Sequence, residues 1–184
     1  MQMVGERQLP VPREVVWAAL NDVDVLKACV PGCESINEVG ERKYEVVMQA
    51  AIGPIKARFK GTMQISDAVA PKGYSLAFEG AGGAAGFARG GAHVDLAEID
   101  TNNTLLQYRS EATVGGKLAQ IGARLVDSAA RVMADRFFDA FVKALQDAGA
   151  SEEGVDSSND DRSTKAQVSG FRGMLRRLKG GDPS

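Results

Sequence analysis

The sequence predicts an α+β domain in which a curved antiparallel β-sheet wraps around one long C-terminal α-helix. Three observations indicate this class. Runs with period-two alternation occupy the middle of the chain, short connections join them, and a long apolar stripe of helical period follows. We expect a curved sheet because a flat one could not bury so long a helix face.

The N-terminal segment predicts one strand and two short helices. Residues 1–11 alternate weakly and stop at Pro10, as in a strand that proline ends. Pro12 suits the first position of a helix whose next two turns carry an apolar stripe. Asp22 can cap a second helix that runs to Ala28, before a Pro-Gly pair breaks it.

The middle of the chain predicts an antiparallel meander. Apolar and polar side chains alternate most clearly over residues 55–65, as expected for a sheet with one face in water. Similar runs lie at 42–52, 73–80, 86–99 and 104–113. A Gly-Pro turn and the segment "DTNNT" are two of the short connections. We expect about six consecutive strands.

From Lys117 to about Ala148 the apolar period becomes 3.6 residues, which predicts a single helix about 45 Å long. A Gly-Gly pair precedes it, and Gly149 can end it. Its apolar stripe is Leu118, Ile121, Leu125, Ala129, Val132, Met133, Phe137, Phe141 and Leu145. A strand, two short helices, a meander and a long helix form the order of a helix-grip fold.

We expect three parts: a helix-grip ligand-binding domain at 1–148, a linker at 149–169 and a basic tail at 170–184. The linker has almost no large apolar residue, so it cannot offset its ordering entropy and should be disordered. Residues 151–169 hold five acids and two basic residues, whereas the tail holds four basic residues and one acid.

The tail regains apolar residues at helical spacing. Phe171, Met174, Leu175 and Leu178 fall on one face, and Arg172, Arg176, Arg177 and Lys179 take the remainder. This is the composition of an interfacial amphipathic helix. Burial and charge attraction barely exceed the ordering cost of so short a helix, so we expect weak, reversible and salt-sensitive binding to an anionic membrane surface. A partner's groove or an unstructured solubility tail also fits this composition.

Composition excludes several classes of protein. The chain has 184 residues, of which 44% are apolar and 25% charged, so a packed core is expected. A net charge of −2 gives no general attraction to nucleic acid. Without an apolar run of about 18 residues or an apolar leader, we expect a cytoplasmic protein. Cys29 and Cys33 flank a turn, and we expect free, part-buried thiols rather than a redox pair or half a metal site.

No catalytic set is evident from the sequence. His93, the single histidine, alternates with Val94 and Leu96, so it should point outwards or lie at a rim. We expect no Ser-His-Asp arrangement, nucleotide-binding loop or Cys-rich cluster. The glycine-rich segment 80–86 lacks the strand–turn–helix context of a dinucleotide-binding fingerprint. We expect the small residues at 80–86 and 90–91 to leave volume for a cavity.

The strand and helix patterns give candidate ligand-binding side chains that should point inwards. They are Met48, Ile52, Phe59, Met63, Phe78, Phe87, Leu106 and Tyr108 from strands, with Ile121, Leu125, Met133 and Phe137 from the helix. The same residues could instead fill a solid core. Abundant glycine and alanine beside flexible methionines and aromatic rings favour an adaptable apolar site.

Four segments of the chain together resemble one family. They are "VPREVVWAALNDVDVLKACVPGCESI", "IGPIKARFKGTMQI", "YSLAFEGAGGAAGFARGGAHVDL" and "GGKLAQIGARLVDSAARVMADRFFDAF". In this order and spacing they are similar to the family of carbon monoxide dehydrogenase G subunits, which belongs to the START and birch-pollen-allergen superfamily of helix-grip proteins. The resemblance covers about residues 1–147.

The resemblance implies an accessory protein rather than an enzyme. Proteins of this family accompany the molybdenum-containing carbon monoxide dehydrogenase and are associated with placing it at the cytoplasmic membrane. The superfamily implies a cavity for apolar molecules between the sheet and the long helix. Because the dehydrogenase passes electrons to the membrane pool, we expect a bound respiratory quinone, menaquinone or ubiquinone, without any covalent cofactor. The protein would lie peripherally on the inner face of the membrane.

Two other functions fit the same resemblance. One is an assembly chaperone that matures the dehydrogenase and carries no ligand. The other is a helix-grip enzyme acting on an apolar substrate, since the superfamily includes cyclases. A paralogue that serves another molybdenum hydroxylase is a further reading.

Overall fold

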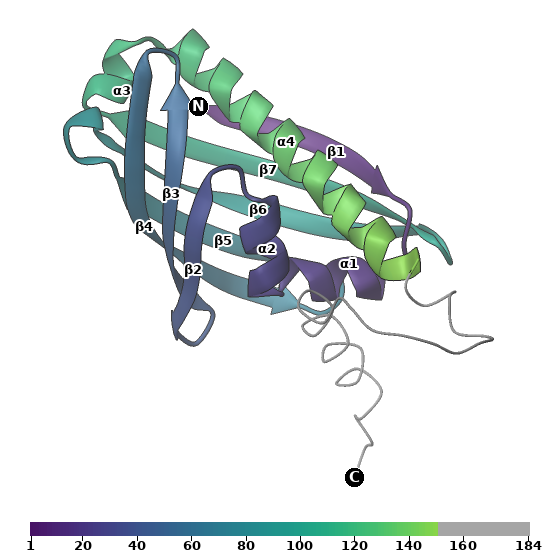
Figure 1. Ribbon diagram of the computed structural model, residues 1–184. Coiled ribbons are helices and arrows are strands. Elements are labelled where there is room, and N and C mark those ends of the chain that lie inside the picture. Colours follow the sequence, from purple (N-terminus) through teal and green to yellow (C-terminus); the bar gives the residue numbers. More distant parts are fainter. Residues whose placement is uncertain (151–184) are drawn as a thin grey trace, which may run out of the picture.

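The computed structural model describes residues 1–150. The predicted tail at 170–184 and almost all of the predicted linker lie outside the described residues. The elements follow in the order β1 (Gln2–Leu9), α1 (Arg13–Leu20), α2 (Val23–Cys29), β2 (Cys33–Gly40), β3 (Lys43–Ile52), β4 (Ile55–Val69), β5 (Gly73–Ala81), the 3₁₀ helix η1 (Gly83–Ala85), β6 (Phe87–Asp100), β7 (Asn103–Gly115), α3 (Lys117–Gln120) and α4 (Ala123–Ala150) (Figure 1).

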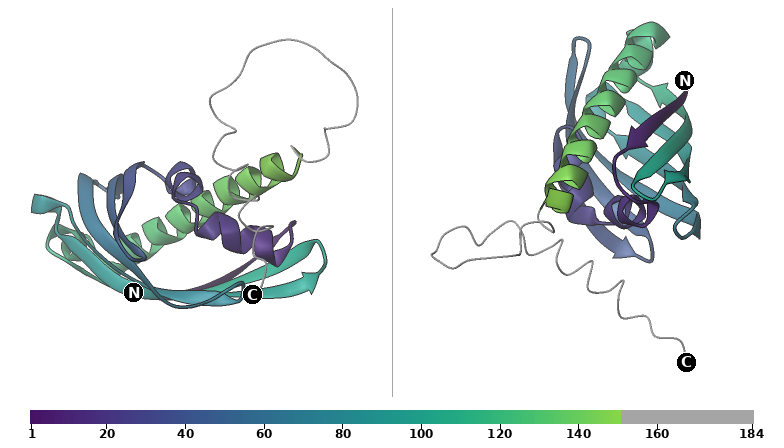
Figure 2. Two further views of the ribbon diagram at one scale, coloured as in Figure 1. Left: turned by 90° about the horizontal axis from the view of Figure 1, so that it is seen from below. Right: turned by 90° about the vertical axis from the view of Figure 1, so that its right-hand side faces the viewer.

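The seven strands form one antiparallel sheet in the order β1-β7-β6-β5-β4-β3-β2. The sheet is curved, and α1, α2 and α4 all lie on its concave side (Figure 2). Register places Met48 opposite Phe59, and Met63 opposite Phe78. Because residues directly opposite one another share a face, these four apolar side chains belong to the concave face. The predicted α+β helix-grip class is confirmed.

The side chains of β4 alternate between buried and exposed, as the apolar–polar alternation of its sequence predicts. From Ile55 to Ile65 every second residue is buried or half-buried, and the residues between them are exposed. Register therefore follows from the requirement that one face be dry. The meander of about six strands is also confirmed, and its first member is β2, which carries no clear period-two pattern.

The core fills the space between the sheet, α1 and the C-terminal half of α4. Leu9, Val16, Leu106, Phe141 and Leu145 are each at most 1% exposed. Burying each of these side chains contributes roughly 1.5–3 kcal/mol. They fix the C-terminal half of the helix against the sheet.

The start of α1 and the cap of α2 follow from single residues. Pro12 is the N-cap and α1 begins at Arg13, one residue later than predicted. Asp22 caps α2 as predicted, because its Oδ1 accepts hydrogen bonds from the backbone N–H groups of Asp24 (2.9 Å) and Val25 (3.2 Å).

The predicted single helix from Lys117 is interrupted. α3 ends at Gln120, and α4 begins at Ala123, directly after Gly122, whose φ of +94° favours glycine. The apolar periodicity of the sequence continues across this break, so periodicity alone cannot predict the break. α4 also runs through Ala150, so the predicted end at Gly149 is wrong.

The buried face of α4 differs from the predicted stripe at single positions. Val126 and Phe138 are only 6% and 8% exposed, although neither belongs to the predicted stripe. Leu125 and Val132, which do belong to it, are 48% and 46% exposed, so the stripe is wrong at these two positions. Its other members in α4, from Ala129 to Leu145, are buried or half-buried as predicted.

Candidate ligand-binding cavity

An apolar cavity lies between the concave face of the sheet and the helices, with a volume of about 450 Å³. All seven strands contribute to its wall, together with α1, α2 and α4. The volume falls within the roughly 300–1,000 Å³ range of small-molecule sites. The cavity is partly open to solvent, so a guest can have one end inside and one outside.

The structure brings seven of the predicted ligand-binding side chains together around this cavity. They are Met48, Phe59, Met63, Phe78, Leu106, Tyr108 and Phe137. Six come from strands and one from α4, so residues far apart in the sequence converge on one space. Ligand binding by these residues stays a prediction.

Phe87 and Leu125 do not point inwards as predicted, because they are 40% and 48% exposed. Side chains alternate between the two faces along β6. Phe87 is an even number of residues from His93, so both side chains point to the convex face, whereas the buried Val94 points to the concave face. Its ring covers Gly115, where an added Cβ would lie 2.2 Å from the ring. Phe87 therefore belongs to the outside of the sheet.

The other three predicted residues, Ile52, Ile121 and Met133, are half-buried but lie outside the cavity wall. Ile121 and Leu125 pack beside the β3–β4 turn instead: a Cβ added at Gly53 would lie 3.9 Å and 3.8 Å from their Cδ1 atoms. The break at Gly122 thus places the N-terminal turn of α4 over the end of the sheet rather than over the cavity.

Several wall residues escape the sequence reasoning. They are mainly Leu20, Leu26 and Val30 from the α1–α2 region, Ile36 and Val46 from the β2–β3 edge, and Tyr74, Leu76, Ala92, Val94, Ala134 and Phe138. Tyr74 and Leu76 share a face with Phe78, so alternation on β5 could have found them. The small apolar residues of the wall are Gly61, Ala92 and Ala134, whereas none of the glycines at 80–86 and 90–91 lines the cavity, so that prediction is wrong.

Two phenols lie in this apolar wall. Tyr74 is 5% exposed and meets Trp17 edge-on at 5.9 Å. Burial, with a smaller contribution from Tyr44, raises the pKa of Tyr74 to about 12, so it stays an O–H donor at neutral pH. Tyr108 stacks on Phe138 at 5.4 Å. The cavity can therefore hold an apolar molecule and offer hydrogen bonds to an oxygen on it.

The family model of CoxG, the G subunit of carbon monoxide dehydrogenase, matches residues 5–146. The chain belongs to the CoxG family. The resemblance seen in the sequence is thereby confirmed, and the family is named for a component of carbon monoxide dehydrogenase.

Solved structures share the fold of this CoxG chain. A conserved protein from Geobacillus kaustophilus is 32% identical, with a TM-score of 0.77, over 80% of this chain and 97% of that one. The Zhui aromatase/cyclase from Streptomyces sp. R1128 is 11% identical, with a TM-score of 0.64, over 84% and 99%. A START superfamily protein from Mycobacterium smegmatis is 9% identical, with a TM-score of 0.63, over 79% and 97%. The last two show a common fold alone. No curated protein matches this chain.

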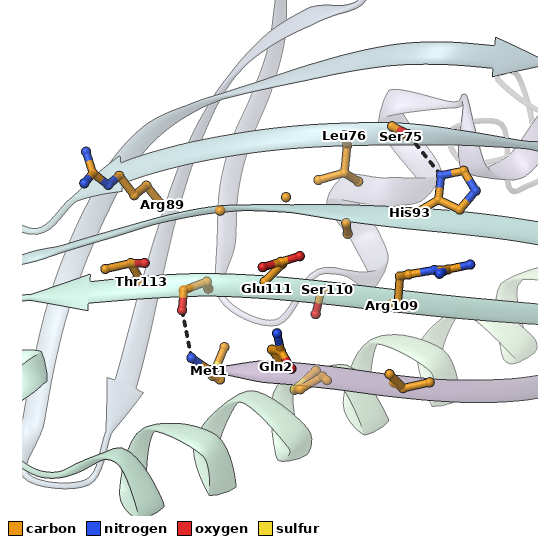
Figure 3. Close-up of a pocket in the computed structure, with 16 residues that line it drawn as sticks. Met1, Gln2, Ser75, Leu76, Arg89, His93, Arg109, Ser110, Glu111 and Thr113 are labelled. Atoms are coloured by element: carbon orange, nitrogen blue, oxygen red, sulfur yellow. Dashed lines mark hydrogen bonds between the residues drawn. The ribbon is translucent and has the colours of Figure 1, made fainter.

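A second depression of about 780 Å³ lies on the convex face of the CoxG chain, across β5, β6, β7 and the start of β1 (Figure 3). Arg89 and His93 lie towards its two ends, with Glu111 between them, and Arg109 lies near His93 (Figure 3). The His93 side chain is 38% exposed, which confirms the predicted outward position. Charged side chains line this groove, which is more polar than the cavity behind it.

The convex groove contains a Ser-His-Asp chain that sequence reasoning does not anticipate. Ser75 Oγ lies 3.0 Å from His93 Nδ1, and His93 Nε2 lies 3.2 Å from Asp95 Oδ1. The expectation of no such arrangement is wrong, because register brings Ser75 opposite His93 across β5 and β6. Both strands are paired on both sides, so their N–H groups are committed to the sheet. No backbone N–H group in the paired segments of β5 and β6 is therefore left as a donor to an oxyanion.

The cysteines are separate from the cavity. Cys29 is buried and Cys33 half-buried, and both are free thiols, in agreement with the prediction. Burial raises the pKa of both thiols, which disfavours the thiolate that binds metals. Over residues 1–150 no three His, Cys, Asp or Glu side chains are grouped as a metal site. No described helix is long and apolar enough to cross a membrane.

Proposed function

We propose that this CoxG-family protein is an accessory protein that recruits molybdenum carbon monoxide dehydrogenase to the cytoplasmic membrane and carries a respiratory quinone for reduction by that enzyme. The observation that carries the proposal is the apolar cavity between the sheet and α4. Membership of a family named for a component of the dehydrogenase supports the partner. The quinone is menaquinone or ubiquinone.

The chemistry of the wall suits a quinone. Its flat ring would lie among aromatic side chains such as Phe59, Phe78 and Phe137, and its isoprenoid tail needs only apolar contacts. Met48 and Met63 can adapt to the ring because thioether side chains are unbranched and polarizable. The cavity is open on one side, so the outer isoprenoid units would leave through that opening.

The quinone carbonyls need hydrogen-bond donors, and Tyr74 and Tyr108 supply phenols from the same face of the sheet, on either side of Val94. Tyr74 stays protonated because burial raises its pKa to about 12. In this proposal the quinone is cargo: the dehydrogenase supplies the electrons, and the residues of this chain bind and orient the guest. No catalytic residue is assigned.

Quinone uptake is tested with the full chain. The protein is mixed with vesicles that contain menaquinone or ubiquinone, separated from them, extracted with organic solvent and analysed by mass spectrometry. We expect close to one quinone per chain. Ala92→Leu adds three carbons inside the cavity and should reduce uptake at least tenfold, whereas Ala97→Leu, on the exposed side of the same strand, should not. Wild-type protein without quinone, or equal uptake by both variants, would refute the proposal.

Membrane recruitment is assigned to the predicted tail at 170–184, on the basis of its four basic residues and its apolar face. Deleting residues 170–184 should abolish co-sedimentation with anionic vesicles, and raising the salt should weaken binding of the full chain. Equal binding by the truncated chain would refute the anchor.

The role towards the dehydrogenase is tested in cells that lack this protein. Full dehydrogenase activity with an artificial soluble electron acceptor, together with loss of carbon monoxide-dependent respiration, is the expected result. An enzyme that is inactive even with the artificial acceptor would contradict the quinone role and indicate an assembly chaperone.

A further inference from the structure

The sheet ends in two edge strands that differ in regularity. The pairing of β2 with β3 shifts register between Cys33 and Ser35 and again between Glu38 and Gly40. Such bulges protect an edge from pairing with another chain. The pairing of β1 with β7 is continuous over the whole of Gln2–Leu9. β1 is therefore the more regular of the two edges.

The backbone groups of β1 that face away from β7 can be assigned. Met1 exchanges both hydrogen bonds with Ala112, at 3.0 and 2.9 Å. Because hydrogen-bonded and non-bonded pairs alternate in an antiparallel ladder, the even-numbered residues of β1 direct their N–H and C=O groups to the free edge. No element is drawn in front of β1 when this side faces the viewer (Figure 2, right).

Apolar side chains flank this edge on both faces of the sheet. Val4 is 80% exposed, more than any other large hydrophobic residue in residues 1–148. On the other face, Asp135 of α4 forms an ion pair with Arg7 of β1. Val132 lies one turn before Asp135, on the same side of α4, and is 46% exposed. A strand added beside β1 would cover Val4.

The charges of β1 leave the backbone groups of Val4 open at the edge. The Arg7 guanidinium turns towards α4, where it pairs with Asp135 and lies 5.2 Å from the centre of the Phe138 ring. Its Nη1 also donates to the Glu6 carbonyl of the free edge at 2.9 Å, and that oxygen keeps a second lone pair for a partner strand. Glu6 is then the one charged side chain on the exposed face of the strand. An edge with a single exposed charge and an exposed valine is a template for another strand.

We propose that β1 pairs in antiparallel fashion with β1 of a second copy, about a two-fold axis between the two Val4 residues. In this register, Val4 faces Val4 of the partner subunit, and Gln2 faces Glu6 of the partner subunit. The free N–H and C=O groups of the two Val4 residues exchange two hydrogen bonds. The two sheets become one continuous sheet with both concave faces on the same side.

Two other two-fold registers, centred on Glu6 and on Gly5, are less favourable. A register centred on Glu6 places two carboxylates opposite each other. One centred on Gly5 places Val4 opposite a charged Glu6. The register centred on Val4 joins valine to valine and amide to carboxylate. A single strand pair offers less surface than the roughly 1,600 Å² of a standard interface, so the dimer should be weak and depend on concentration.

Cysteine cross-linking of the full chain, in a Cys33→Ser background, tests the register. Hydrogen-bonded antiparallel pairs have Cα atoms about 5.5 Å apart, within the 4.4–6.8 Å range of disulfides. Val4→Cys should therefore form a dimer on mild oxidation. Glu6→Cys is the matched control: its two copies are offset by about 13 Å along the strand, so it should cross-link only when Gln2→Cys is also present. Equal cross-linking of the two single variants, or none in either, would overturn the proposal.

Sedimentation equilibrium provides the second measurement. Wild-type protein should show a monomer–dimer equilibrium, and Val4→Lys should raise its dissociation constant at least tenfold. Val69→Lys changes another exposed valine, 57% exposed on β4, and should have no effect. A monomer at every concentration overturns the proposal, as does a dimer that Val4→Lys leaves unchanged. If the wild-type protein forms no dimer and Val4→Lys loses binding to the dehydrogenase, the proposal is overturned, and the edge of β1 binds the dehydrogenase instead.

Discussion

Replacing Tyr74 by phenylalanine tests whether the cavity wall is as dry as the structure requires. The side chain is 5% exposed, and burial raises its pKa to about 12 from an ordinary value near 10. The folded protein therefore keeps the phenol protonated over a range in which the unfolded chain releases the proton. Stability from this group is complete below pH 10 and is lost as the pH rises towards 12.

The size of the effect follows from the two pKa values. One pKa unit corresponds to 1.36 kcal/mol, and at pH 11 the unfolded phenol is about nine-tenths ionised whereas the folded one is about one-tenth ionised. Between pH 8 and pH 11 the wild type should lose about 1.4 kcal/mol more stability than Tyr74→Phe. The full loss at higher pH would approach about 2.7 kcal/mol.

Urea unfolding of both proteins at pH 8, 9, 10 and 11 measures this difference by linear extrapolation. Subtracting the variant from the wild type removes most of the contribution of Tyr44 and the lysines, which titrate in both proteins. A difference that stays constant from pH 8 to pH 11 would show that Tyr74 is hydrated, and the assignment of a dry wall would be wrong.

Three substitutions test how the frame around the cavity is held. Thr104 is fully buried and its Oγ1 donates to the carbonyl of Val11 at 2.8 Å, so Thr104→Val should cost about 1–3 kcal/mol in urea unfolding, and Thr104→Ser clearly less. Asp22→Ala removes the cap of α2 and should cost about 1 kcal/mol, with loss of helical circular dichroism as a second readout. Gly122→Ala should cost about 1–2 kcal/mol through its backbone alone, because φ is +94° and no atom lies within 4 Å of the added Cβ. A Gly122→Ala protein as stable as the wild type would contradict the break between α3 and α4.

Local patterns predict much of this fold. Alternation from Ile55 to Ile65 fixes the two faces of β4, because one face of an antiparallel sheet must be dry. The cap at Asp22 is likewise a matter of adjacent residues. These features depend on neighbours in the chain, so the sequence is enough to find them.

Other features depend on tertiary arrangement and cannot be found in this way. The break at Gly122 interrupts no period, so periodicity predicts one continuous helix, and Leu125 is assigned to the cavity although it packs beside the β3–β4 turn. Ser75 and His93 meet only because of strand register. Whether an apolar residue such as Leu26 fills the core or lines a cavity depends on the volume of side chains across from it.

The most direct test of the central claim uses Trp17, the only tryptophan of the chain, whose ring meets Tyr74 of the cavity wall at 5.9 Å. A short-chain quinone is titrated into the full-length protein, and tryptophan fluorescence is recorded. We expect saturable quenching with one site per chain, weakened at least tenfold in Ala92→Leu and unchanged in Ala97→Leu. Quenching that rises linearly without saturation, and equally in all three proteins, would contradict a hollow interior that holds an apolar guest.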